Sequence, residues 1–183
     1  MRLETERLIL HPMTLAELKS AAKDLTLVTR PLGVSLPHIG FWERQGKRRI
    51  CKVKSGLVAQ NPRAWLLSTS WLVIRREGFC MVGEAGLKGP PTERYTVEIG
   101  YGAPESCRNR GYMTEAIGAL TRFALFQKEY CVERVTALTL PGNIASHRVL
   151  EKNRYTRQPS YGKYWLWERV KYPEDKTERG YIL

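Results

Sequence analysis

The 183-residue sequence lacks the features that mark membrane proteins, zinc proteins and disulfide scaffolds. No apolar run is long enough to cross a bilayer, and residues 1–7 are charged, without the apolar stretch of a signal peptide. The cysteines form no CxxC pair and the histidines show no ligand spacing, so we expect no bound metal. These absences predict a cytoplasmic protein, without a membrane partner, whose thiols are reduced and mostly buried.

Repeats, low-complexity segments and internal domain boundaries are also absent. A hydrophobic content of 43% in 183 residues suits one domain with a substantial core. We therefore expect a single domain over residues 1–183. Within it, residues from about 25 to 60 are broken by proline and glycine, and the charged tail at 173–183 is expected to be loose.

Acidic residues are scarce relative to basic ones. The chain has 30 Lys and Arg against 18 Asp and Glu, which gives a net charge of +12. Such a charge attracts polyanions, but it does not distinguish coenzyme A from RNA or from an acidic protein. Five basic residues fall within the eight from Lys47 to Lys54, in a stretch where Ile50, Val53 and Leu57 are spaced like one helix face. This stretch is either a solvated basic helix or a contact for an acidic substrate or a phosphate.

A strand, a basic turn and a helix follow one another in the middle of the chain. Apolar and polar residues alternate over 95–101, which predicts a strand, and apolar residues recur at three and four over 113–124, which predicts a helix. The turn between them carries Arg108, Arg110 and Gly111. It has fewer glycines than the Walker pattern or GxGxxG. The free amides of the first helical turn and the two arginines would suit a phosphate, although a solvated surface turn remains an alternative.

The run Arg108-Asn109-Arg110-Gly111-Tyr112-Met113 resembles the Q/R-x-x-G-x-G/A acetyl-CoA loop of the GNAT acetyltransferases. Residues 112–116 resemble the GYxTEA run of the branch that acetylates ribosomal-protein N-termini. Residues 143–155 resemble that branch's N-x-x-S-x-x-V-L-E-K-x-G-F, and residues 3–10 have its TERLxL look. Three positions depart from the pattern. Met113 stands where Gly or Ala is usual, which predicts a less close approach of the phosphates, Arg154 replaces a Gly, and Leu150 occupies the place of a tyrosine acid.

The resemblance implies acetyl-CoA as the co-substrate, with no metal. It also implies a GNAT-like α/β (α+β) domain, whose mixed, mostly antiparallel sheet has about six to seven strands and helices on both faces. It places the substrate wall in the variable residues from about 25 to 60. The residues that the resemblance assigns to coenzyme binding are Tyr101, Gly102, Ala103, Arg108, Asn109, Arg110, Gly111, Tyr112, Met113, Thr114 and Asn143.

Catalysis needs a neutral amine, an oriented carbonyl and a proton for the leaving thiolate. Glu98, on the polar face of the central strand, is the leading candidate for the base, directly or through a water, with Glu84 as the runner-up. A carboxylate paired with an arginine is the alternative for Glu98. Asn143 is a helix cap that by resemblance also reaches the pantetheine arm. Ser146 is either near the thioester sulfur or a solvated helix residue, and the acid is unassigned.

The acceptor is expected to be a primary amine that attacks directly in a ternary complex. An α-amino group, with a pKa of about 7.7–8.0, is easier to neutralise than lysine at about 10.4. This favours a protein N-terminus or a small amine, possibly an acidic one, as the partner of a monomer or homodimer. Two other functions stay open: an inactive acetyl-CoA sensor, and a basic RNA-binding module, for which the half-buried aromatic pattern is a poor match.

The remaining elements are predicted from periodicity and from turn residues. Thr14 is expected to cap a helix over 15–22. Asn143 is expected to cap a helix that runs to about residue 153. Strands are expected at 7–11, 65–76, 79–87, 132–140, 155–158 and 161–170, with Pro12 ending the first of them and Trp165 and Trp167 on one face of the last.

Overall fold

The computed structural model describes residues 1–38, 40–92 and 94–172. Its eight-stranded sheet has the order β1-β2-β3-β4-β5-β6-β8-β7. The strands are β1 (Leu3–Glu4), β2 (Leu8–Pro12), β3 (Ser70–Arg75), β4 (Cys80–Leu87), β5 (Thr96–Gly102), β6 (Arg134–Thr139), β7 (Thr156–Tyr161) and β8 (Tyr164–Val170). Neighbouring strands are antiparallel, apart from the parallel pair β5 and β6.

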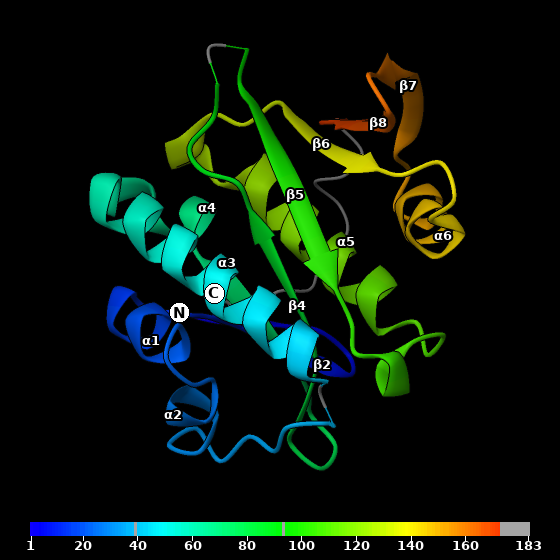
Figure 1. Ribbon diagram of the computed structural model, residues 1–183. Helices are drawn as coiled ribbons and strands as arrows, with labels where there is room; N and C mark the ends of the chain where they lie inside the picture. The colour runs from blue at the N-terminus through cyan, green and yellow to red at the C-terminus, as the bar shows by residue number, and fades with distance from the viewer. Residues whose placement is uncertain (39, 93, 173–183) are drawn as a thin grey trace.

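Helices lie on both sides of this sheet (Figure 1). They are α1 (Leu15–Ala21), α2 (Thr26–Thr29), α3 (Phe41–Gln60), α4 (Trp65–Ser68), α5 (Tyr112–Phe126) and α6 (Ile144–Lys152), with short 3-10 turns at Pro62–Ala64, Glu105–Cys107 and Lys128–Tyr130. The fold is therefore a mixed, mostly antiparallel sheet between helices. It has one or two strands more than the sequence predicts, because β1 adds a two-residue edge strand.

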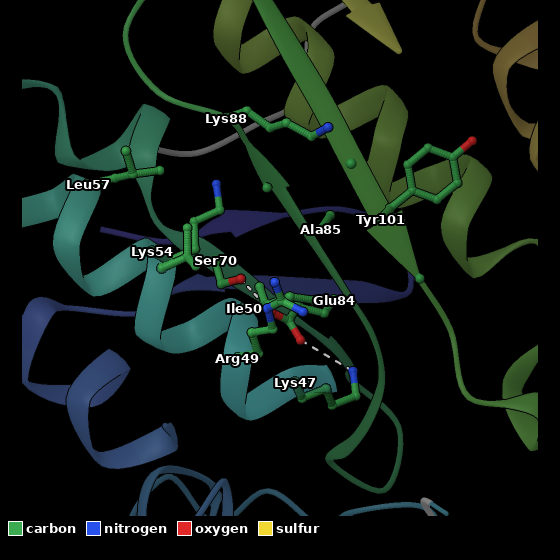
Figure 2. A pocket seen from close by; sticks show the side chains of 14 residues that line it. Lys47, Arg49, Ile50, Lys54, Leu57, Ser70, Glu84, Ala85, Lys88 and Tyr101 are labelled. Atoms are coloured by element: carbon green, nitrogen blue, oxygen red, sulfur yellow. Dashed lines mark hydrogen bonds and ion pairs between the residues drawn. The ribbon is translucent and has the colours of Figure 1, made fainter. Parts of the chain in front are cut away.

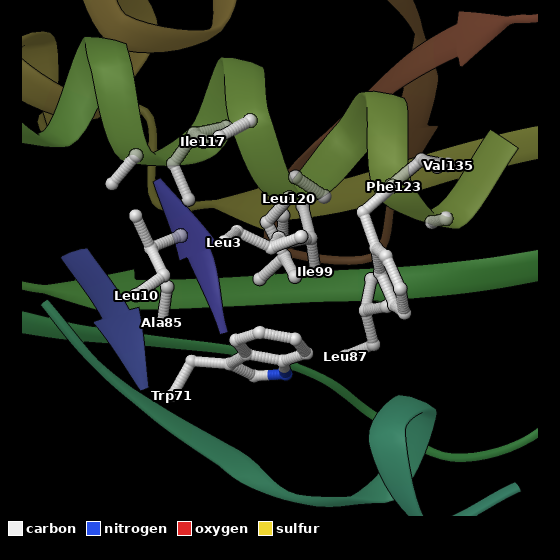
Figure 3. Close-up of a cluster of buried hydrophobic side chains, with 14 of the residues drawn as sticks. Leu3, Leu10, Trp71, Ala85, Leu87, Ile99, Ile117, Leu120, Phe123 and Val135 are labelled. Carbon is white, nitrogen blue, oxygen red and sulfur yellow. The ribbon is translucent and has the colours of Figure 1, made fainter. Parts of the chain in front are cut away.

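The alternation of side chains along the strands produces two cores, one on each face of the sheet. The larger core joins the sheet to α5, and its members include Trp71, Leu87, Ile99 and Leu120 (Figure 3). The Trp71 ring lies 5.3 Å from that of Phe123 across this interface. The smaller core lies under α1 and α3, where Leu18, Cys51 and Val58 pack against Leu72 and Ile74.

Both predicted helix caps are present. The Thr14 side chain accepts from the Glu17 amide and Glu17 accepts in return from the Thr14 amide, which completes a capping box. The Asn143 Oδ1 atom accepts from the Ser146 amide at 3.2 Å. Arg154, in place of the family's glycine, adopts a left-handed φ of 60°, which explains why glycine is usual there.

Three expectations were wrong. Residues 65–68 form α4 rather than the start of a strand, because the 3-10 turn begun by Pro62 leads into a helical turn that buries Leu66 and Leu67. Strand β2 covers Leu8–Pro12 instead of residues 7–11, so Pro12 is its last residue and not the first residue after it. The thiols are not mostly buried, since Cys51 is buried, Cys80 and Cys107 are half-buried and Cys131 is exposed.

The segment at 25–60 also differs from its prediction. It contains α2 and the 20-residue α3, although Gly46 and Gly56 lie within α3. The face with Ile50 and Val53 is not buried, since these residues are 48% and 57% exposed. The buried face is instead formed by Cys51, Lys54 and Val58, displaced by one residue. The predicted loose tail at 173–183 lies outside the described residues.

Candidate functional site

The N-terminal end of α5 is open toward solvent. Gly111 is its N-cap, with a left-handed φ of 77° that a glycine adopts readily. Within the part of the chain that the structure describes, no side chain caps this first turn, so its amides are available to a ligand. Arg108, Asn109 and Arg110 are exposed just before it, and Arg108 Nε donates to the Ala103 carbonyl at 3.2 Å. Such an end suits an anion.

Glu115 ties this turn to the N-terminal strands. Its Oε1 atom accepts from Thr5 Oγ1 at 2.6 Å and from the Arg7 amide at 2.9 Å, and its Oε2 atom accepts from Arg7 Nε at 2.7 Å. Arg7 Nη1 also donates to the Arg110 carbonyl at 3.2 Å. Burial alone would raise the pKa of Glu115, but the hydrogen bonds from Thr5 and Arg7 outweigh it and lower the pKa. The TERLxL-like stretch at residues 3–10 and the GYxTEA-like run at residues 112–116 therefore contact each other.

Met113 does not extend over the open turn. A Cβ atom placed on Gly83 would lie 2.5 Å from Met113 Cε and 2.7 Å from the Gly102 carbonyl oxygen. The methionine side chain therefore lies against Gly83, between α5 and β4. The sequence predicted that Met113, being larger than Gly or Ala, keeps the phosphates farther from the helix. This geometry gives no support for that prediction, because the Met113 side chain is directed to the interior.

Strands β5 and β6 part beside this helix end. They pair from Thr96 with Arg134 to Glu98 with Thr136, whereas from Ile99 onward the described pairing of β5 is with β4 (Figure 1). Tyr101, beyond the last pair, donates from its hydroxyl to the Ser146 carbonyl at 3.2 Å, which bridges β5 and α6. Burial raises the pKa of Tyr101 to about 12, so its hydroxyl stays protonated at neutral pH.

The predicted coenzyme residues lie at the ends of β5, α5 and α6, and contacts of Tyr101 with Ser146 and of Thr114 with Asn153 join these elements. Tyr101, Gly102 and Ala103 lie at the end of β5, residues 108–114 form the turn and the start of α5, and Asn143 and Ser146 lie at the start of α6. The Thr114 backbone carbonyl accepts from Asn153 Nδ2 at 3.0 Å, the Thr114 residue is half-buried, and Tyr112 is 9% exposed. The donors left at the opening are backbone amides and guanidinium groups, which fit the diphosphate of coenzyme A.

A pocket of about 570 Å³ lies on the opposite face of the sheet, between α3 and strands β4 and β5 (Figure 2). Gly86, Gly100 and Gly102 line its floor without side chains, and Tyr101 links it to the opening described above. Its volume is in the range of small-molecule sites. The other lining residues are Lys47, Arg49, Ile50, Val53, Lys54, Leu57, Ser70, Glu84, Ala85 and Lys88.

The two candidate bases have different surroundings. Glu84 lines the pocket and is 7% exposed, and its carboxylate accepts from Ser70 Oγ and from Lys47 Nζ, the latter at 3.2 Å. Glu98 is half-buried at the edge of the pocket, where it forms an ion pair with the pocket residue Lys88. The alternative of an ion pair was right in kind for Glu98, although the partner is a lysine.

Lys54 ends the basic stretch from Lys47 that the sequence offers as a contact for an acidic substrate or a phosphate, but its burial was not expected. It is 9% exposed, and its ammonium group donates to the Leu87 carbonyl oxygen. Burial lowers the pKa of Lys54 to about 8, while the nearby charge of Glu84 acts in the opposite direction. The spacing of Cys51, Lys54 and Val58 on one helix face was a usable signal, but a lysine is rarely expected on a buried face.

The other titratable groups have structural surroundings. His147 is buried, stacks on Trp165 with ring centroids 4.6 Å apart, and bonds through Nε2 to the Leu140 carbonyl at 3.1 Å. Tyr155 is 4% exposed and shares a hydrogen bond of 2.7 Å with Thr121 Oγ1. Over residues 1–38, 40–92 and 94–172, no group of His, Cys, Asp and Glu could hold a metal ion. Over the same residues, no helix has both the length and the apolarity of a membrane span.

Comparison with known proteins identifies the family. Residues 7–156 match the family described as the acetyltransferase (GNAT) domain. The Bacillus subtilis protein named uncharacterized N-acetyltransferase YjdG is 29% identical, over 90% of this chain and 95% of its own.

Two solved structures share the fold. The ribosomal L7/L12 alpha-N-protein acetyltransferase RimL in complex with coenzyme A has a TM-score of 0.63 at 18% identity, covering 93% of this chain and 98% of its own. The ribosomal-protein-S5-alanine acetyltransferase of Vibrio fischeri has a TM-score of 0.63 at 14% identity, covering 93% and 96%.

Proposed function

The chain belongs to the GNAT acetyltransferase family, and on this premise we propose that it transfers the acetyl group of acetyl-CoA to a primary amine. The transfer is direct, within a ternary complex of enzyme, thioester and amine. Acetyl-CoA supplies the activated acetyl group as a thioester. The residues of the chain bind and orient the two substrates and take a proton from the amine.

The observation that carries the proposal is the open first turn of α5 beside the parting of β5 and β6. The amides that follow Gly111, together with Arg108 and Arg110, hold the diphosphate. A hydrogen bond to a charged group contributes roughly 1.5–3 kcal/mol, so several of them account for specific binding. Asn143 and Ser146, at the start of α6, flank the pantetheine arm where β6 no longer pairs with β5.

Glu98 takes the proton from the attacking amine, directly or through a water. It lies at the last paired position of β5, where the strand starts to part from β6, and it is more accessible than Glu84. Lys88 holds its carboxylate in place. Glu84, already bonded to Ser70 and Lys47, is the second candidate, and its position inside the pocket is the reason to test it in parallel.

The acceptor is a protein N-terminus or a small primary amine. Two structural relatives are named for acetylating ribosomal proteins, and one name specifies the α-amino group. The pocket behind β5 is large enough for one or two residues of an N-terminal segment. An α-amino group also demands less from the base, because its pKa of about 7.7–8.0 leaves part of it neutral at pH 7.

The experiment has a binding step and a turnover step. Acetyl-CoA is titrated in a thermal-unfolding assay, where binding to the native state raises the midpoint temperature. Thiol release is then followed with a panel of N-terminal peptides and small amines. We expect a concentration-dependent shift and acceptor-dependent thiol release. Binding without release on any amine would instead support an acetyl-CoA sensor, and absence of both would overturn the proposal.

A further inference from the structure

The pocket between α3 and the sheet has an excess of positive charge that its own carboxylate does not neutralise. Its lining includes Lys47, Arg49, Lys54 and Lys88, against the single carboxylate of Glu84. Glu84 is engaged by Lys47 and Ser70, and Lys88 is engaged by Glu98 at the pocket edge. This leaves Lys54 and Arg49 without a carboxylate partner among the described residues.

Lys54 is the better-placed of these two. Arg49 is exposed, so solvent screens its charge, whereas Lys54 is 9% exposed. An ammonium group has three donors, and the structure assigns Lys54 the Leu87 carbonyl oxygen as an acceptor. The charges of Glu84 and Glu98 act on Lys54 without forming an ion pair with it, so a ligand anion in direct contact would stabilise this buried charge further. With a pKa lowered to about 8, Lys54 is still mostly charged at pH 7.

We propose that the acceptor of this enzyme is an amine that also carries a carboxylate, and that Lys54 binds this carboxylate in the pocket. The proposal rests on the proposed function and names the substrate class of the same site. The amine points toward β5 and Glu98, and the carboxylate lies against α3. Ile50, Val53 and Leu57 form the apolar part of the α3 wall and contact the carbon chain between the two groups (Figure 2).

Two sources present this chemistry, namely an acidic residue near a protein N-terminus and a free amino acid-like molecule. The test uses matched acceptors for each. One pair is Ser-Glu-Ala-Tyr amide and Ser-Gln-Ala-Tyr amide, which differ only in the carboxylate. The other pair is β-alanine and β-alaninamide. The value of kcat/KM for each acceptor is measured by thiol release from acetyl-CoA.

We expect the wild-type protein to prefer the carboxylate member of at least one pair by about tenfold, which corresponds to roughly 1.4 kcal/mol. The pair with the larger preference identifies the source. In Lys54→Met the ratio within that pair should approach one, and Lys54→Gln, a second neutral variant, should show the same loss. Lys52→Met is the matched control, because it removes the same charge from an exposed position of α3 and should keep the ratio.

Equal values for the two members in the wild-type protein, or a ratio that survives in both Lys54 variants, would overturn the inference. Calorimetric binding of the two peptides separates this failure from that of the proposed function. If no acceptor releases thiol, the proposed transfer is wrong. Even then, tighter binding of the Glu peptide that is lost in Lys54→Met supports the carboxylate site, and equal binding contradicts it.

Discussion

Glu98 and Glu84 lie on adjacent strands on the α3 side of the sheet, but their bonds suit them to different tasks. The carboxylate of Glu84 is enclosed and its two oxygens are engaged by Ser70 and Lys47. A carboxylate held in this way shapes and charges the pocket wall. Glu98 has one cationic partner, and its side chain is 27% exposed against 9% for Glu84. It therefore has room to accept a proton from a water or an amine.

The Glu98→Gln variant should lower kcat/KM by about a hundredfold, because general-base catalysis contributes roughly that much or more. The pH profile of kcat/KM should also change, and the rise with pH that remains should follow the ionisation of the acceptor amine alone, which must be neutral to attack. Both are measured by thiol release at saturating acetyl-CoA from about pH 5 to about pH 9. This range covers the ionisation of an α-amino group.

Glu84→Gln is the matched comparison for that experiment. It should affect KM more than kcat and should keep the shape of the pH profile. Unchanged kinetics in Glu98→Gln, together with a lowered kcat/KM and a changed pH profile in Glu84→Gln, would move the base to Glu84.

Residue-level prediction from the sequence succeeded where a side chain has one dominant role. Thr14 and Asn143 were recognisable as caps because few residue types accept from backbone amides at a helix start. Lys54 was not recognisable, because its burial depends on how α3 lies over β4, which no local pattern contains. The direction of the Met113 side chain likewise depends on Gly83, which is 30 positions earlier in the chain.

At the scale of elements, the open end of α5 is positioned by the strands at the N-terminus. Glu115 accepts from Thr5 and Arg7, and Arg7 also donates to the carbonyl of Arg110. The start of α5 is therefore attached to the turn between β1 and β2. This explains why the first residues of the chain and the start of α5 both carry recognisable sequence motifs.

The Glu115→Gln variant should be less stable to urea by about 1 kcal/mol at pH 7, because the remaining amide accepts fewer of these charged hydrogen bonds. The pKa of Glu115 is lowered in the folded state, so its contribution is present above the unfolded pKa of about 4.5. That contribution is lost as the pH falls through the folded pKa. The difference between variant and wild type should therefore shrink below about pH 4.5.

Glu151→Gln is the control for this prediction, since Glu151 is an exposed helical glutamate and the change in charge is the same. Its stability should stay close to that of the wild type at both pH values. A Glu115→Gln protein as stable as the wild type at pH 7 would show that the link between the β1–β2 turn and α5 contributes nothing measurable.

Element prediction was accurate where hydrophobic period and turn residues agree, as in β4, β5, α5 and α6. It failed in α4, and in α3 it indicated a helix but not the extent of that helix or its buried face. In α3 the glycines and the basic run hide the buried face with Cys51 and Val58, and packing against the smaller core outweighs the weak local preference. In α4 the alternation of residues 65–69 suits a strand equally well. In the structure, the Trp71 indole N–H donates to the Leu66 carbonyl at 3.1 Å, which holds β3 against the helical turn.

On the scale of the whole molecule, the sheet separates the two proposed sites. The proposed coenzyme site lies at the start of α5, and the pocket proposed for the acceptor lies under α3 on the other face. Strand β5 belongs to both, since Tyr101 lines the pocket and bonds to α6, and Gly100 and Gly102 leave the floor open. The net charge of +12 would attract both coenzyme A and the carboxylate-bearing acceptor that we propose. In the proposed arrangement, the thioester and the amine meet across the end of β5.

The central claim is that the backbone amides at the start of α5 bind the diphosphate. Amide proton–nitrogen NMR spectra recorded during a titration with coenzyme A test it most directly. The account predicts that the amides of Gly111, Tyr112, Met113 and Thr114 show the largest shifts, and that inorganic pyrophosphate shifts the same four. Coenzyme A that leaves these amides unshifted at millimolar concentration, or that shifts another region of the sheet, would contradict it.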